Sequence, residues 1–503
     1  MSQQKLRAGD VQVYRACDFL SGPVIYFFWL FGPWAFGTTQ PWSIWTMNTA
    51  GFVLGLLLLP KLVIRWFRGY RPPRWESRAT AMAEGPSTRI IRRLTVALAV
   101  LTVLVITWCF VSALNARATW HPTLLRFDYH GCLSWLPNSL DSSKSWSAFW
   151  MYLGMACAFW GLRDWLLGLS DVEARCASAA AARLDAVEVS QSGFLLPERL
   201  RRLLWLLAIN GGFLAVEGIF QRLEGSGKLL FLLKPRVNPG AVAQFGPWAY
   251  RANAAQYFNL LWPVCVGFWW TLQRSPGAPG RGRHVLLVCA SLMAACPIIS
   301  SSRGGAMVTV GLLVLVLILL FAMHFFLRSR RASDRRHALA ELAIFFLSAL
   351  ALGLGMGWKN LAPRMEEVPE GFAGREQMSA LARPMAEDYP WFGTGPGTFE
   401  TVFQLYRPAL DTYWPAQLHN DWLETRITFG LLGSGLLILA LGIVLARWFL
   451  PGGVHGGRRF VLLIWLAIAG CLVHARFDLP FQIHSIAALF LALCAILSVV
   501  SRE

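Results

Sequence analysis

Long apolar segments alternate with polar segments along the whole chain. Twelve apolar segments reach or approach the ~20 residues that an α-helix needs to cross a bilayer. Their apolar positions are continuous rather than alternating, which favours helices over the strands of a membrane barrel. The predicted spans cover residues 19–35, 44–64, 94–114, 147–168, 202–221, 255–272, 284–300, 305–327, 339–357, 427–446, 460–474 and 483–500.

The polar segments differ in charge from one side of the predicted membrane to the other. One set of connecting segments, together with both chain ends, carries 30 of the 46 Lys and Arg residues. Cytoplasmic loops of membrane proteins are enriched in Lys and Arg, so we expect both termini to be cytoplasmic. No small-residue cleavage site follows the first span, which we therefore interpret as a retained helix.

Composition supports a membrane protein, and topology explains the high net positive charge. The 503 residues are 55% hydrophobic and 15% charged, with a mean hydropathy of +0.47. The net charge of +18 would suggest a nucleic-acid partner, but its placement is accounted for by topology, and we predict the bilayer instead. Of the 10 cysteines, only Cys132 falls in a predicted external loop, so no external disulfide pair is available.

These observations predict an all-α, polytopic membrane helical bundle with about 12 transmembrane helices. We expect two parts: residues 1–200, with about four spans and basic cytoplasmic loops, and a second membrane domain over residues 201–503. A long external loop, residues 358–426, separates the ninth and tenth spans.

A histidine stands where this long loop enters the next span. His419 has the side chain best suited to accept a proton near neutral pH. Asn420 and Asp421 are N-cap residue types, and Glu424 follows one helical turn later, where it could orient His419 or Asn420. The alternative is that His419 is an interfacial residue that helps to cap the helix.

Three arginines in the external segments are candidates for binding a phosphate group. Arg303 lies in the short Ser301–Gly305 connection between two spans, and an ionisable group at membrane depth is costly. Arg375 lies in the long loop and Arg251 precedes the sixth predicted span. Together they could clamp a diphosphate, whereas each alone could be an interface anchor. The glycine-rich run 393–399 is expected to form a tight turn or hinge.

The last external turn holds His474, Asp478 and His484. Their spacing matches no typical metal site, and Asp478 is interpreted as part of a helix-to-turn break. The sequence also lacks phosphate-loop, CxxC and HExxH motifs. We therefore predict no metal and no cofactor.

Three short motifs resemble those of the O-antigen ligase and polymerase superfamily, over roughly residues 200–500. They are Ser302-Arg303-Gly304 between two spans, the run Gly393–Phe399 in the long loop, and His419-Asn420-x-x-Leu423 ahead of Gly430-x-x-Gly433. Residues 201–503 would then be the O-antigen ligase-like domain.

The resemblance implies a bacterial inner-membrane enzyme whose active face is periplasmic. Such proteins transfer a glycan from undecaprenyl diphosphate, without metal and with inversion, to an acceptor hydroxyl. The acceptor is a lipid A-core sugar for a ligase, another repeat unit for an O-antigen or exopolysaccharide polymerase, or a protein hydroxyl in a third branch. We expect an O-antigen ligase first, with a polymerase as the alternative.

By position, His419 matches the family's loop histidine and Arg303 and Arg375 match arginines near the diphosphate, with Arg251 less securely placed. The family often has a glutamate nine residues after the histidine, where this chain has Thr428. Two other classes stay open at this point: a lipid-linked glycan transporter and a non-catalytic envelope assembly protein.

Overall fold

The computed structural model describes residues 6–74, 86–175, 196–273, 282–326, 332–408, 415–446, 454–455 and 457–501. Within these residues the helices are α1 (Ala8–Trp34), α2 (Pro41–Phe67), α4 (Pro86–Leu114), α5 (Ser142–Leu167), α7 (Glu198–Glu224), α8 (Arg251–Leu272), α9 (His284–Ile299), α10 (Arg303–Phe326), α11 (Ala332–Glu366), α12 (Val368–Asp388), α13 (Phe399–Val402), α14 (Asp421–Ala446), α15 (Arg458–His474) and α16 (His484–Val499). Short 3-10 helices are η1 (Phe36–Thr38), η3 (Ala241–Ala243), η4 (Phe403–Tyr406) and η6 (Pro480–Gln482).

Each of the twelve predicted spans overlaps one of these helices. In the described part of the chain, six helices are long and apolar enough to cross a membrane, namely α2, α4, α7, α10, α11 and α14. The shorter helices α9, α15 and α16 are also apolar. The predicted all-α membrane bundle is therefore confirmed, while the count of about twelve spans stays a prediction. Much of the predicted basic cytoplasmic loops, including residues 75–85 and 176–195, lies outside the described residues.

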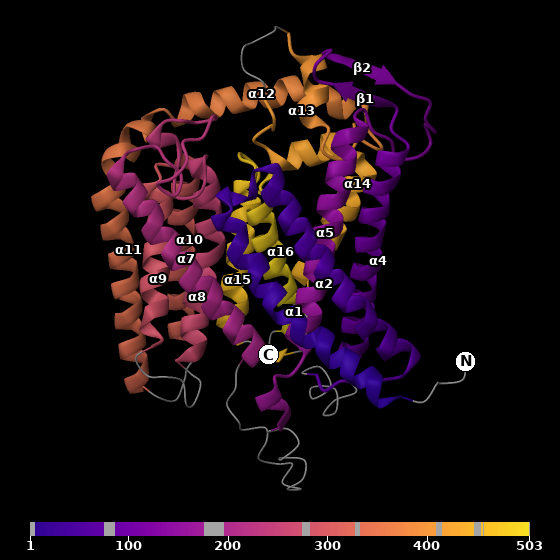
Figure 1. Ribbon diagram of the computed structural model, residues 1–503. Helices are drawn as coiled ribbons and strands as arrows, with labels where there is room; N and C mark the ends of the chain where they lie inside the picture. The colour runs from indigo at the N-terminus through magenta and orange to yellow at the C-terminus, as the bar shows by residue number, and fades with distance from the viewer. Residues whose placement is uncertain are drawn as a thin grey trace.

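The segment predicted as a long external loop is largely helical. Helix α11 continues to Glu366 and α12 follows at once, crosswise over one end of the bundle (Figure 1). The polar character of the segment suggested a loop, but Ser379, Ala382 and Met385 lie on one face of α12 and are buried. An amphipathic helix lying across the bundle end explains both the polarity and the helical order. We call α12 the cap, and the end of the bundle that it covers the capped end.

A small apolar cluster holds this cap on the start of α14. It includes Met385 of α12, Phe399 of α13, Phe403, Leu418 and Ile427, all nearly fully buried. Leu418 directly precedes His419 in the chain. Packing of the cap therefore positions the backbone that carries the candidate histidine.

The remaining elements of the capped end form a hairpin. Strand β1 (Ala118–His121) pairs antiparallel with β2 (Arg126–Tyr129), and Trp120 lies opposite Phe127. At the other end, β3 (Val454–His455) and β4 (Val500–Ser501) form a short parallel pair.

The glycine-rich run is fixed against a break in α14. Gly430 has φ +66° inside the helix, and a Cβ there would lie 2.3 Å from the carbonyl oxygen of Trp391. The Thr394 amide donates to the Ile427 carbonyl at 2.9 Å. Only glycine tolerates such positive φ and close backbone approach without strain. The glycine-rich run thus forms the tight turn that was expected. Its backbone hydrogen bond to α14 holds it in place, so it is not a free hinge.

One hydrophobic core runs through most of the bundle, from Ile25 in α1 to Val500. It includes residues on both sides of the predicted boundary at residue 200, such as Leu166 and Leu204. The division into residues 1–200 and 201–503 stays a prediction.

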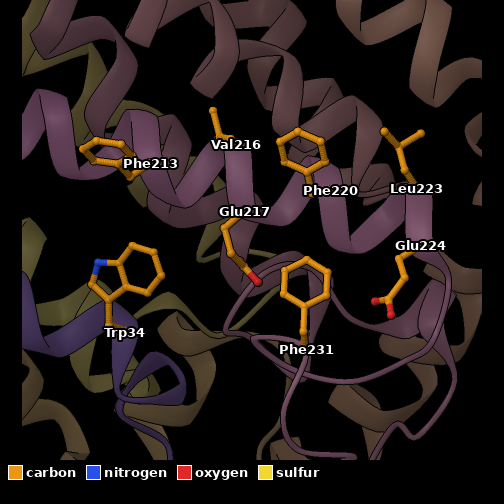
Figure 2. Close-up of a pocket in the computed structure, with 8 residues that line it drawn as sticks. All are labelled: Trp34, Phe213, Val216, Glu217, Phe220, Leu223, Glu224 and Phe231. Carbon is orange, nitrogen blue, oxygen red and sulfur yellow. The ribbon is translucent and has the colours of Figure 1, made fainter.

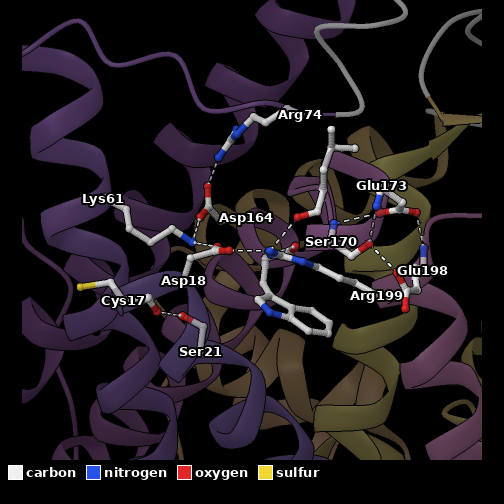
Figure 3. A network of polar contacts seen from close by, with 12 residues as sticks. Cys17, Asp18, Ser21, Lys61, Arg74, Asp164, Ser170, Glu173, Glu198 and Arg199 are labelled. Atoms are coloured by element: carbon white, nitrogen blue, oxygen red, sulfur yellow. Dashed lines mark hydrogen bonds and ion pairs between the residues drawn. The ribbon is translucent and has the colours of Figure 1, made fainter. Parts of the chain in front are cut away.

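Buried ion pairs join α1, α2, α5 and α7 at the end opposite the cap (Figure 3). Lys61 Nζ lies 2.7 Å from Asp18 Oδ1 and 2.6 Å from Asp164 Oδ2. Arg65 also pairs with Asp164, and Arg199 with Asp18. The Lys61 and Asp164 side chains are only 2% and 8% exposed, so loss of one partner leaves a buried charge uncompensated.

Candidate active site

His419 forms a hydrogen bond with the carboxylate of Asp478, which follows 59 positions later in the chain. Its Nδ1 lies 3.1 Å from Asp478 Oδ1, in the turn between α15 and α16. The histidine side chain is 25% exposed, whereas the Asp478 side chain is 2% exposed. Because an ionised carboxylate can only accept, His419 Nδ1 must carry the hydrogen. Nε2 is then the ring atom that can accept a proton.

Asp478 is held as an anion by the groups around it. Burial raises the pKa of its carboxyl, but the hydrogen bond from His419 and the charge of Arg375 outweigh burial, and the net pKa is below the usual value. Arg375 Nη2 lies 3.7 Å from Asp478 Oδ2, and His474 Nε2 lies 3.8 Å from the same oxygen. The Leu479 amide donates to Oδ1 at 3.1 Å.

The backbone at His419 is unusual. Its φ is +57°, in the left-handed region that L residues other than Asn, Asp and His rarely enter. Asn420 Oδ1 accepts from the Leu423 amide at 3.3 Å, as an N-cap does, which confirms that prediction. The Asn420 N-cap therefore fixes the backbone directly after His419, the residue with the positive φ.

The two acids after Asn420 support the backbone. Glu424 Oε2 accepts from the Leu418 amide at 2.8 Å, so it braces the residue before His419 and does not bond to His419 itself. Asp421 Oδ2 accepts from the Phe481 amide at 2.7 Å and Oδ1 from Gln482 Nε2 at 3.2 Å. Asp421 therefore ties α14 to the turn that carries Asp478.

Arg375 lies beside the His419–Asp478 pair. Its Nη1 donates to the Phe477 carbonyl and its Nη2 to the Tyr250 hydroxyl at 3.3 Å. The rings of Tyr250 and His419 meet edge-to-face with centroids 5.9 Å apart. The structure therefore brings together Arg375 and His419, which are 44 positions apart in the sequence.

Arg303 is the first residue of α10 and lies under the cap. Its Nη1 donates to the Glu367 carbonyl at 2.7 Å and lies 3.7 Å from the Glu367 carboxylate. A Cβ at Gly371 would lie 2.6 Å from Arg303 Nη2, so α12 packs directly on the guanidinium. The Arg303 side chain is 25% exposed.

Arg251 belongs to a larger group of arginines. It starts α8, four residues before the predicted span, and its Nη1 donates to the Val242 carbonyl at 2.6 Å. Burial, together with the positive charges of Arg364, Arg222 and Arg303, lowers its pKa to about 10. Several guanidiniums thus share one region, as an anion-binding site requires.

Sequence reasoning did not single out Asp478 as a partner of His419, nor Tyr250, Arg222 and Arg364. Arg222 is a hydrogen-bonded support, since it donates to the carbonyls of Ala241, Gln244 and Ser300. Arg364 has a buried Nε without a partner among the described residues. A usable signal was the single arginine close to the outer end of several predicted spans, such as Arg222 directly after residues 202–221.

An apolar hollow on α7 contains none of the predicted site residues. It measures about 740 Å³ and is lined by Phe213, Phe220 and Glu217 of α7, by Trp34 and by Phe231 (Figure 2). Among the described residues, no group of three or more His, Cys, Asp or Glu side chains is arranged to hold a metal ion.

Part of the chain matches a known protein family. Residues 288–438 match a family model described as O-Antigen ligase. The matched segment contains Arg303, Arg375 and His419, whereas Arg251 and Asp478 lie outside it. No curated protein and no solved structure matches the chain. The match covers the segment that carries His419 and supports membership of this multi-pass membrane protein in the O-antigen ligase superfamily, whose members are glycosyltransferase-like enzymes.

Proposed function

We propose that the chain transfers a glycan from undecaprenyl diphosphate to an acceptor hydroxyl on the periplasmic face of the bacterial inner membrane. The observation that carries this proposal is the His419–Asp478 pair beside Arg375 and near a group of arginines. The proposed enzyme is an O-antigen ligase, in agreement with the description of the matched family. Its proposed acceptor is lipid A-core.

In this mechanism His419 Nε2 takes the proton from the acceptor hydroxyl as that oxygen attacks the anomeric carbon. The new bond joins the acceptor oxygen to the anomeric carbon. The bond between that carbon and the diphosphate oxygen breaks, and the diphosphate leaves with the electron pair. Asp478 fixes the proton on Nδ1 and stabilises the imidazolium that forms.

Arg303, Arg375 and Arg251 hold the diphosphate and stabilise the charge that builds on it. Stabilisation of developing charge by fixed donors is often the largest catalytic contribution. Arg364 joins this set because its guanidinium acts on the same region. The donor is already activated, which suits a mechanism without metal or cofactor.

The test is glycan transfer in cells whose chromosomal copy is deleted, with each variant supplied at matched expression. We expect His419→Ala, Arg303→Ala and Arg375→Ala to abolish or strongly reduce transfer. Matched controls are His121→Ala on the exposed hairpin and Arg383→Ala, whose partner on α12 is the exposed Glu376. Near wild-type transfer by the His419 variant would contradict the general-base role.

Glycan gels of the deletion strain separate the ligase from the polymerase. Loss of a ligase leaves lipid-linked chains unattached, whereas loss of a polymerase leaves caps of a single repeat unit. Activity of the purified protein in the presence of a strong chelator tests the metal-free mechanism, and a strict requirement for a divalent ion would contradict it.

A further inference from the structure

The hollow on α7 lies outside the candidate active site and combines aromatic rings with carboxylates (Figure 2). Its rings come from α1, from α7 and from the loop after α7, and they belong to Trp34, Phe213, Phe220 and Phe231. Its two acids, Glu217 and Glu224, are both on α7. Among the described residues, no Lys or Arg side chain lines it. Aromatic faces and carboxylates both attract cations, so the lining suits a positively charged group.

Glu217 is a buried acid that the chain leaves without a hydrogen bond. Both carboxylate oxygens are buried, and neither has a partner among the described residues. A Cβ on Gly246 would lie 2.8 Å from Glu217 Oε2, yet the Gly246 amide donates to Gln221 Oε1 at 2.6 Å. An unpaired buried carboxylate is strongly destabilising, and an ionisable residue within a membrane helix is by default a candidate for function. A cationic donor from outside the chain would satisfy it.

The loop that carries Phe231 is strained where it meets the hollow. Leu230 and Phe231 have φ of +52° and +61°, in the left-handed region that such residues rarely adopt. The Phe231 amide donates to the Lys228 carbonyl at 3.3 Å, which closes the turn, and Gln221 Nε2 donates to the same carbonyl at 3.0 Å. These bonds hold the Phe231 ring beside Glu217 (Figure 2). Backbone strain of this kind is typical of segments that clamp a ligand.

The hollow faces the bilayer at the depth of lipid head groups. Phe213, Phe220 and Leu223 line it and are 63%, 60% and 65% exposed, on a helix long and apolar enough to cross a membrane. Glu217 precedes the last residue of α7, Glu224, by seven positions, or about 10 Å. With α7 about 40 Å long, this places Glu217 close to the boundary between head groups and hydrocarbon. The loop after α7 lies at the capped end (Figure 1).

An ethanolamine phospholipid matches these groups. Its primary ammonium has three N–H donors for a carboxylate and a positive charge for the aromatic faces. Its phosphate is close to the ammonium, and Lys228, exposed on the loop that carries Phe231, can offset the phosphate charge. Its acyl chains would pack on the exposed rings of Phe213 and Phe220. A choline head group would suit the rings but has no N–H to donate to Glu217.

We propose that the α7 hollow binds the ammonium head group of an ethanolamine phospholipid, with Glu217 as its hydrogen-bond acceptor. Because the Glu217 oxygens are covered, the head group enters by displacing the Phe231 ring beside them. Movement of that ring releases the strained backbone at Leu230 and Phe231. The site is separate from His419, and the inference does not depend on the proposed function.

Native mass spectrometry of the detergent-solubilised full-length protein tests the site. The probes are phosphatidylethanolamine, its N-acetyl derivative and phosphatidylcholine, all with the same acyl chains, and the readout is the Kd of the first bound lipid. N-acetylation removes the positive charge, and the choline head group lacks an N–H donor. We expect phosphatidylethanolamine to bind about tenfold more tightly than either analogue, or better, because each analogue loses a charged hydrogen bond.

A matched pair of variants tests the role of the carboxylate. Glu217→Gln keeps the size of the side chain and removes its charge. It should raise the Kd for phosphatidylethanolamine about tenfold or more and leave the Kd for the N-acetyl derivative unchanged. The control is Glu387→Gln, an exposed acid on α12, which should match the wild type. Without added lipid, Glu217→Gln should not lower the Tm, since it removes an unpaired buried charge.

Several outcomes would overturn the inference. Equal affinity of the wild type for phosphatidylethanolamine and its N-acetyl derivative would do so without any variant. Equal affinity for phosphatidylethanolamine and phosphatidylcholine would contradict the hydrogen bond to Glu217. An unchanged Kd in Glu217→Gln would show that the carboxylate takes no part, and equal weakening in Glu217→Gln and Glu387→Gln would show a nonspecific charge effect instead of a site.

Discussion

Replacement of Asp478 by asparagine tests the centre of the proposed site most directly. Asn is nearly the same size as Asp, so Asp478→Asn keeps the packing of a side chain that is 2% exposed. It removes the negative charge that accepts from His419 Nδ1 at 3.1 Å and faces Arg375 Nη2 at 3.7 Å. The His419 side chain itself is untouched.

The expected loss follows from the strength of the bond that is replaced. A hydrogen bond to a charged group contributes about 1.5–3 kcal/mol. If that stabilisation is needed while His419 holds the acceptor proton, kcat should fall about 10- to 150-fold. Loss of the anion also removes the charge that stabilises the imidazolium formed in the proposed mechanism.

The assay is glycan transfer by purified protein in vesicles, with kcat and KM measured from pH 5 to 9. The double variant His419→Ala/Asp478→Asn provides the control, because residues that act as one unit have strongly non-additive effects. We expect it to match His419→Ala alone. Multiplication of the two single losses would refute the idea that Asp478 acts through His419.

Three further changes test other parts of the structure. Gly371→Ala should displace the Arg303 guanidinium and raise the KM for donor, with little loss of thermal stability. The control is Gly374→Ala on the same helix, where a Cβ meets nothing within 4 Å; it should leave the KM for donor unchanged. Gly430→Ala should lower the free energy of unfolding by about 1–3 kcal/mol or more, seen as a lower Tm, because it forces a side chain into positive φ against backbone atoms; an unchanged Tm would contradict the close approach. Asp164→Asn should destabilise by about 3–5 kcal/mol in thermal unfolding, since it strips the partner from buried cations; a stable variant would show that the network is dispensable.

Helices were predictable here because crossing a bilayer demands long apolar segments. Every predicted span overlaps a helix, and Asn420 caps α14 as its residue type indicated. The cap was harder to predict. Helix α12 is polar on most of its surface, so its hydropathy resembles that of a loop, although its buried face at Ser379, Ala382 and Met385 has a helical spacing.

The candidate site could be predicted only one residue at a time. His419 and Arg375 were picked out by their place in the chain, but their partners come from elsewhere: Asp478 from the last turn and Tyr250 from the start of α8. Nothing local in the Asp478-Leu-Pro sequence distinguishes a catalytic partner from a helix-ending residue. Pairing across 59 positions is set by the packing of α15 and α16 against α14, which a single sequence does not encode in any short motif.

The left-handed backbone of His419 costs stability that its pairing with Asp478 returns. An L residue with φ near +57° loses roughly 1 kcal/mol relative to glycine, which adopts that conformation freely. The hydrogen bond to the buried Asp478 carboxylate contributes about 1.5–3 kcal/mol and outweighs that cost. His419→Gly should therefore be less thermostable than the natural chain, and a selection for heat resistance alone would retain the histidine.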